Sequence, residues 1–109
     1  MLPNAELAIV EQAKVRDYLL SASHPVGRFK AAVFFAIGYR AERWQVLQQD
    51  LLTIARTGEA RLGQASAYGQ KYEVSGNLHG PSGRQAMFTT VWLVSAGSGV
   101  PRFVTAFPA

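Results

Sequence analysis

The sequence predicts an α+β fold in which N-terminal helices pack on a three- to four-stranded antiparallel β-meander. Apolar residues recur at helical spacing through the first half of the chain, and after Gly63 the period falls to two while β-branched and aromatic residues take over. The 109 residues are 49% hydrophobic and carry a net charge of only +4, which excludes intrinsic disorder. We therefore expect a single domain over residues 1–109 that buries a core without disulfides.

Three amphipathic helices are expected in the first half of the chain. The first runs from about residue 12 to residue 22, and the LAIV segment before it fits either a short strand or an earlier helical turn. Pro25 suits the first turn of a second helix, which Gly38 ends. The third covers residues 41–56 and ends at Gly58, and its inward residues are expected to be Trp44, Leu47, Leu51, Ile54 and Ala55.

The second half of the chain predicts the strands. Residues 71–78 alternate between polar and apolar side chains, with a bulge expected at Gly76, and a short additional strand is possible near residues 59–62. Residues 85–94 are apolar on both faces and indicate the central strand. The last strand, 101–107, is expected to place two sets of side chains on opposite faces: Arg102, Val104 and Ala106 on one, Phe103, Thr105 and Phe107 on the other.

Several classes of protein are disfavoured by composition. The longest apolar run, residues 31–37, falls far short of the roughly 20 residues that span a bilayer, so no membrane segment is expected. The N-terminus has no basic region ahead of an apolar core, and we therefore expect a cytoplasmic protein without a secretory signal. With no cysteine, two histidines and no close pair of carboxylates, neither a metal centre nor any other cofactor is expected.

The segment HPVGRFK gathers His24, Arg28 and Lys30 around a helix start. Helix N-termini attract anions, so a phosphate bound here would meet backbone N–H groups and two cations, with His24 able to move a proton. The alternative is that His24 only caps the helix while Arg28 and Lys30 are solvated.

Two arginines of the predicted meander form a second candidate. Arg84 follows a glycine-rich turn that lacks the spacing of a phosphate-binding loop, and Arg102 lies on the adjoining strand. Since neighbouring strands are about 4.8 Å apart, both could lie close to Thr105 or Tyr72 and polarise a phosphodiester. The alternative is that they are edge-strand arginines that deter aggregation or pair with Glu73.

A set of segments resembles a known family across almost the whole chain, from Pro3 to Pro108. These segments are LPNAELAIV, VRDYLLSASHPVGRFKAAVFFAIGY, YGQKYEV, TVWLV and PRFVTAFP. The family comprises small, often stand-alone bacterial proteins described only as a domain of unknown function. In outline it is similar to small ribonuclease toxins of the barnase, colicin and RelE type.

The resemblance to ribonuclease toxins implies metal-free cleavage of RNA through the 2′-hydroxyl. It also implies a small protein partner that covers the site. The implied roles are His24 as general base, Arg28 and Lys30 as phosphate holders, Arg84 or Arg102 as stabiliser of the developing charge, Thr105 as hydrogen-bond donor, and Tyr72 or Lys71 as acid beside the phosphate.

The competing class is a non-enzymatic module whose basic surface binds a protein or a nucleic acid. Geometry discriminates between the two. Convergence of His24, Arg28, Arg84 and Arg102 in one cleft favours the enzyme, and scattering over opposite faces favours the module.

Overall fold

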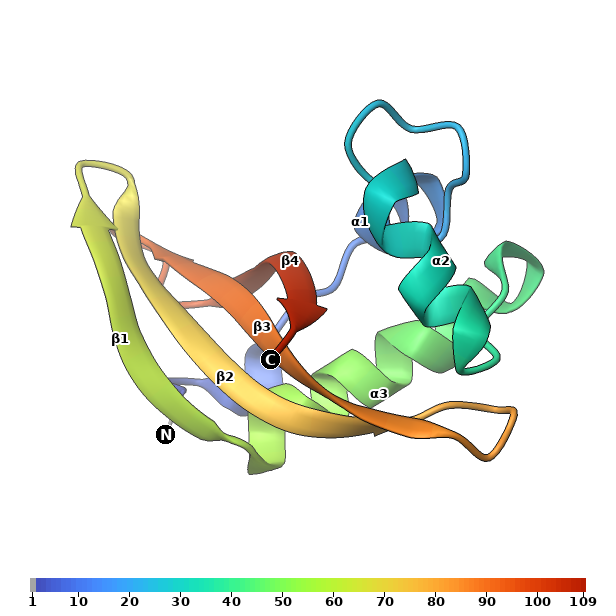
Figure 1. The fold of residues 1–109 in the computed structure, drawn as a ribbon. Coiled ribbons are helices and arrows are strands. Elements are labelled where there is room, and N and C mark those ends of the chain that lie inside the picture. The colour runs from blue at the N-terminus through green and yellow to red at the C-terminus, as the bar shows by residue number, and fades with distance from the viewer. Residues whose placement is uncertain (1) are drawn as a thin grey trace.

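The computed structural model describes residues 2–109 and confirms the α+β fold, with helices followed by a four-stranded antiparallel sheet (Figure 1). The strands lie in the order β1-β2-β3-β4. The elements are the 3-10 turn η1 (Ala5–Leu7), α1 (Gln12–Lys14), the π-helical turn η2 (Val15–Leu19), α2 (Arg28–Ala36), the 3-10 turn η3 (Ala41–Arg43), α3 (Trp44–Thr57), β1 (Glu59–Ser66), β2 (Gly69–His79), β3 (Gln85–Ser95) and β4 (Pro101–Pro108).

The first predicted helix is present but ends at Leu19, three residues early. Its last turn is π-helical, with the N–H of Leu20 donating to the carbonyl of Val15. The hydroxyl of Ser21 then accepts from the backbone N–H groups of Ser23 and His24, so the chain turns instead of continuing the helix.

The LAIV segment combines both expected forms. Its first residue ends the turn η1, and Ile9 forms a parallel bridge with Arg102 of β4. Helix α2 begins three residues after Pro25, because a turn closed by the Arg28 N–H and the His24 carbonyl comes first. The expected end of α2 is confirmed, since Gly38 follows it with a φ of 105°.

The expected bulge at Gly76 is wrong. Gly76 pairs with Phe88 in an uninterrupted β2–β3 register. The glycine serves helix packing, since a Cβ at this position would lie 2.7 Å from Ile54 of α3. The additional strand near residues 59–62 is confirmed and extends to Ser66 as β1.

The faces predicted for β4 are also wrong, because β4 carries a bulge of its own. Thr105 pairs with Val91 and Phe103 pairs with Trp92, which leaves Val104 as the extra residue. Phe103 therefore joins the core beside Trp92, whereas Thr105 turns to the opposite face.

One face of the sheet holds the core. Helix α3 packs against β2 and β3 on this face, as Figure 1 shows, and α1 contacts β4. The inward residues predicted for α3 are buried, Trp44 excepted, which is half-buried against the core. Among the aromatic residues, Phe34, Phe88, Trp92 and Phe103 are buried, whereas Phe107 on the opposite face is 39% exposed. Within the described residues, no helix has the length and apolar character needed to cross a membrane.

Candidate functional site

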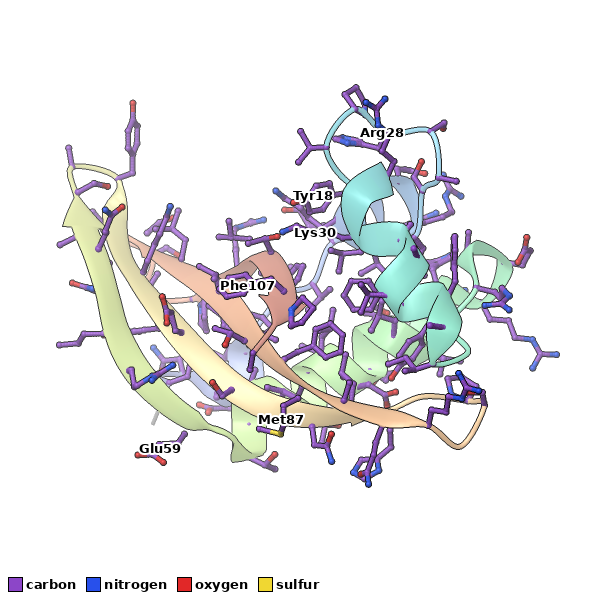
Figure 2. The ribbon with its side chains drawn as sticks, viewed as in Figure 1. Tyr18, Arg28, Lys30, Glu59, Met87 and Phe107 are labelled. Carbon is purple, nitrogen blue, oxygen red and sulfur yellow. The ribbon has the colours of Figure 1, made fainter. Side chains whose placement is uncertain are left out.

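A cluster of three polar side chains lies where the helices meet the outer strand of the sheet. The ammonium of Lys30 donates to the hydroxyl oxygen Oγ1 of Thr105 at 2.7 Å. The hydroxyl of Tyr18 hydrogen-bonds to the same oxygen at 3.1 Å. Nζ of Lys30 also lies 5.6 Å from the centre of the Tyr18 ring and 5.9 Å from that of Phe107, and Figure 2 shows these side chains pointing toward one another.

Each member of the cluster depends on a local irregularity of the backbone. Tyr18 belongs to the π-helical turn η2, and Thr105 faces the cluster because of the bulge at Val104. Lys30 lies in the first turn of α2, which approaches η2 so closely that a Cβ on Gly27 would stand 1.9 Å from the Tyr18 carbonyl oxygen. Glycine at this position permits the contact between the two helical segments.

The cations of the cluster change the acidity of Tyr18. Burial acts to raise the pKa of this phenol. The hydrogen bonds to Thr105 and Lys30, together with the charges of Lys30 and Lys14, outweigh burial and lower the pKa below its ordinary value of 10. A larger share of Tyr18 is therefore ionised near neutral pH than of an ordinary tyrosine.

The cluster opens onto a surface groove of about 620 Å³, within the range of small-ligand sites. Lys14 brings a second cation to the groove and lies 5.7 Å from the centre of the Tyr18 ring. The groove is lined by Glu11, Ala13, Lys14, Asp17, Tyr18, His24, Val26, Val104 and Thr105.

His24 lines the groove and caps the turn that leads into α2. Its Nδ1 accepts hydrogen bonds from the backbone N–H groups of Val26 and Gly27, at 3.0 and 2.9 Å, and its ring meets the edge of Tyr18. The capping role that the sequence offered for His24 is therefore confirmed. Because Nδ1 is the acceptor, the neutral ring carries its proton on Nε2 and can donate to a ligand.

The remaining cations of HPVGRFK are Arg28 and Lys30, both in the first turn of α2. Arg28 is exposed at the start of α2, and Figure 2 places it above Tyr18 and Lys30. Lys30 is not simply solvated, because it binds Thr105. The segment therefore supplies one cation, Lys30, that contacts the groove residues Tyr18 and Thr105.

The two sheet arginines are not brought together. Arg102 pairs opposite Leu93, whereas Arg84 precedes the first residue of β3, so about 30 Å of strand separates them. Arg102 binds the groove residue Glu11 at 2.9 Å, and Glu73 is paired with Arg61 instead. The expectation that Arg84 and Arg102 lie close is wrong, because their strand positions are at opposite ends of β3.

Lys71 and Tyr72 lie on β2, outside the groove. Lys71 shares a sheet row with Leu93 and Arg102, so it faces away from the core, about two strand spacings from Arg102. Tyr72 pairs with Trp92, and its partly buried side chain packs against the core. The proposed acid and phosphate roles of these two residues therefore gain no support from their positions.

Sequence reasoning missed Tyr18 as a functional residue. Tyr18 lies at helical spacing with Val15, Leu19 and Ala22, which predicts one apolar stripe of the first helix, and a tyrosine at such spacing usually packs in a core. Two signals were nevertheless present in the sequence: a lysine four residues earlier, and the place of Tyr18 in the DYLL segment that carries the family resemblance.

Comparison with protein families decides the membership that the sequence pattern indicated. The family model described as Domain of unknown function (DUF6883) matches residues 1–109. The chain belongs to this family. No curated protein matches this DUF6883 chain.

A solved structure shares the fold of the DUF6883 chain. It is a chain of a contact-dependent growth inhibition toxin–immunity protein complex from Klebsiella pneumoniae 342. The two chains superpose with a TM-score of 0.71 and 23% sequence identity, over 93% of this chain and 99% of the other. At this identity the likeness establishes the fold, and function has to be argued from the site.

Proposed function

We propose that this protein is a toxin-like ribonuclease that cleaves RNA through its 2′-hydroxyl without a metal ion. The observation that carries the proposal is the hydrogen-bonded cluster of Lys30, Thr105 and Tyr18 at the edge of a groove that Lys14 and His24 also line. The cluster combines a phenol of lowered pKa, a cation and a hydroxyl bridge between them, which are the groups that such a reaction requires.

In the proposed reaction the 2′-oxygen attacks the neighbouring phosphorus and the bond to the 5′-oxygen breaks. Ionised Tyr18 accepts the proton of the 2′-hydroxyl, and the Lys30 ammonium gives a proton to the departing 5′-oxygen. The products are a 2′,3′-cyclic phosphate and a 5′-hydroxyl. The Thr105 hydroxyl, bonded to both side chains, then returns the proton from Tyr18 to Lys30 and restores the starting state.

Other groups of the groove hold the substrate. The positive charges of Lys14 in the groove and of Arg28 at the start of α2 offset the developing charge on the phosphate, and Nε2 of His24 donates a hydrogen bond to it. His24 is given this role and not that of general base, because the lone pair of Nδ1 is occupied by two backbone N–H groups. An RNA substrate also agrees with the cytoplasmic site of action expected from the sequence.

The non-enzymatic alternative has one observation in its favour. Arg84 and Lys71 lie away from the groove, which is the scattering expected of a binding surface. Against it, His24 lines the groove and Arg102 binds Glu11 of the same groove. We therefore favour the enzyme.

A small protein partner forms part of the proposal. The structural neighbour comes from a toxin–immunity complex, and a protein that covered this groove would have to offset the charges of Lys14 and Lys30 with acidic side chains. Such a partner and RNA would compete, so an RNA oligonucleotide should displace it in a competition titration. Simultaneous binding of both would contradict a shared site.

The function is tested by incubating a labelled RNA with the protein in the presence of EDTA. We expect cleavage with 2′,3′-cyclic phosphate ends, and we expect Lys30→Gln and Thr105→Val each to slow it by about 10²-fold or more. Arg84→Gln is the matched control, since it removes a cation far from the groove and should leave the rate unchanged. Absence of cleavage by the wild-type protein, or full activity of Lys30→Gln, would refute the proposal.

A further inference from the structure

The groove beside the cluster carries two carboxylates that a phosphate backbone does not require. Glu11 and Asp17 line it together with Lys14, Tyr18 and Thr105. A carboxylate beside a bound phosphate repels it, so these two groups face a part of the ligand that donates hydrogen bonds.

The two carboxylates differ in what they already bind. Both oxygens of Asp17 are taken by Arg16, with N–O distances of 2.9 and 3.5 Å. Glu11 binds Arg102 through Oε1 only, and Oε2 has no hydrogen-bond partner among the described residues. A carboxylate has about four acceptor positions, so Glu11 is held in place by Arg102 and retains the capacity to bind a ligand.

The rest of the groove suits a flat apolar ring. Ala13, Val26 and Val104 contribute apolar surface to the groove that the carboxylates and Tyr18 also line, and Val26 is 55% exposed. An unstacked base placed on this surface would present its hydrogen-bonding edge to the rim of the groove.

We infer that this groove binds the base next to the cleaved phosphate and selects guanine through Glu11. The inference rests on the proposed ribonuclease function and adds its base specificity. Guanine offers two adjacent donors, N1–H and the N2 amino group, which one carboxylate can accept together. Adenine and cytosine place an acceptor nitrogen beside their amino group, and uracil flanks its single N–H with two carbonyl oxygens, so each brings acceptors against the carboxylate.

The inference is tested by measuring the affinities of the four nucleoside 3′-monophosphates by calorimetry. Guanosine 3′-monophosphate is expected to bind at least about tenfold more tightly than the other three. Glu11→Gln should remove this preference and leave the binding of adenosine 3′-monophosphate nearly unchanged. Glu6→Gln is the matched control, since Glu6 lies in η1 and is not among the groove residues, and it should keep the preference.

The outcomes separate this inference from the function on which it rests. Equal binding of all four nucleotides, or a guanine preference that survives Glu11→Gln, overturns base selection by Glu11. The phosphate site and RNA cleavage stand in that case. Failure of every nucleotide to bind, together with absence of RNA cleavage, overturns both.

Discussion

At the scale of single residues, the account depends on the acidity of Tyr18. A tyrosine is a weak base at neutral pH unless its surroundings stabilise the ionised form. Here two lysines and the Thr105 hydroxyl do so from three different segments of the chain. The chemistry is therefore a product of tertiary contacts.

The first prediction concerns this acidity directly. The pKa of Tyr18, followed through its ring carbon signals in an NMR titration, should lie below 10. Lys30→Gln should raise it, because the variant removes a nearby positive charge and a donor. As a base works only when deprotonated, cleavage should accelerate with rising pH up to this pKa. A titration of Tyr18 that Lys30→Gln leaves unchanged would contradict the account.

The second prediction concerns the turn ahead of α2. His24→Ala removes the acceptor of two backbone N–H groups and should lower the free energy of unfolding by about 1 kcal/mol. His24→Asn should recover part of the loss, since asparagine also accepts backbone N–H groups. Arg84→Ala, at an exposed turn, should change stability by less than about 0.5 kcal/mol. Chemical denaturation measures all three, and equal effects of His24→Ala and Arg84→Ala would argue against the capping role.

At the scale of elements, most boundaries followed from local sequence. Gly38 and Gly58 end the helices they were expected to end, and the alternation of β2 gave its faces correctly. The π-helical turn at Tyr18 and the bulge at Val104 were not predictable, because each depends on neighbours distant in sequence. These two irregularities bring Tyr18 and Thr105 to the cluster. Lys30 and Thr105 could therefore be named as candidates from the sequence, whereas Tyr18 and the contacts that join the three side chains could not.

The third prediction tests the packing of α3 on the sheet. Gly76→Ala places a methyl group 2.7 Å from the Ile54 side chain and should destabilise the protein by about 1–3 kcal/mol. Gly63→Ala adds the same group to β1, where the nearest atom is 3.3 Å away, and should destabilise the protein by less than Gly76→Ala does. Thermal unfolding compares the two. If Gly76→Ala proved as stable as the wild-type protein, close packing of α3 would not explain this glycine.

At the scale of the whole molecule, one hydrogen bond ties the end of α2 to the middle of α3. The buried hydroxyl of Tyr39 donates to Oδ2 of Asp50 at 2.5 Å. Burial, the hydrogen bond and the charge of Asp50 together raise the pKa of Tyr39 above its ordinary value of 10.

The fourth prediction follows from that raised pKa. The unfolded chain ionises Tyr39 near pH 10, whereas the folded protein keeps it protonated. Its contribution to stability is therefore complete below about pH 10 and is lost as the pH rises above that value. Tyr39→Phe should lower the free energy of unfolding by about 1.5–3 kcal/mol at pH 7. The stability of this variant should also depend less on pH in the alkaline range. Urea unfolding between pH 8 and 11 measures both effects, and a Tyr39→Phe variant with the wild-type pH dependence would contradict them.

The placement of charge was the least predictable property of the whole molecule. His24 and Lys30 are near neighbours in sequence, and in the structure His24 lines the groove while Lys30 contacts its residues Tyr18 and Thr105. Arg84 and Arg102 are separated in sequence, and only the strand register shows that they lie far apart. A local cluster of residues could thus be predicted, whereas a cluster assembled from distant strands could not.

The central claim, that RNA binds at the Lys30–Thr105–Tyr18 cluster, is tested most directly by an NMR titration with a 2′-O-methyl RNA oligonucleotide, which lacks the reactive hydroxyl. The account predicts that the amide signals of Tyr18, Lys30 and Thr105 shift, that those of the β2–β3 turn around Arg84 do not, and that the affinity falls steeply with salt. Shifts confined to the β2–β3 turn, or none at all, would contradict it.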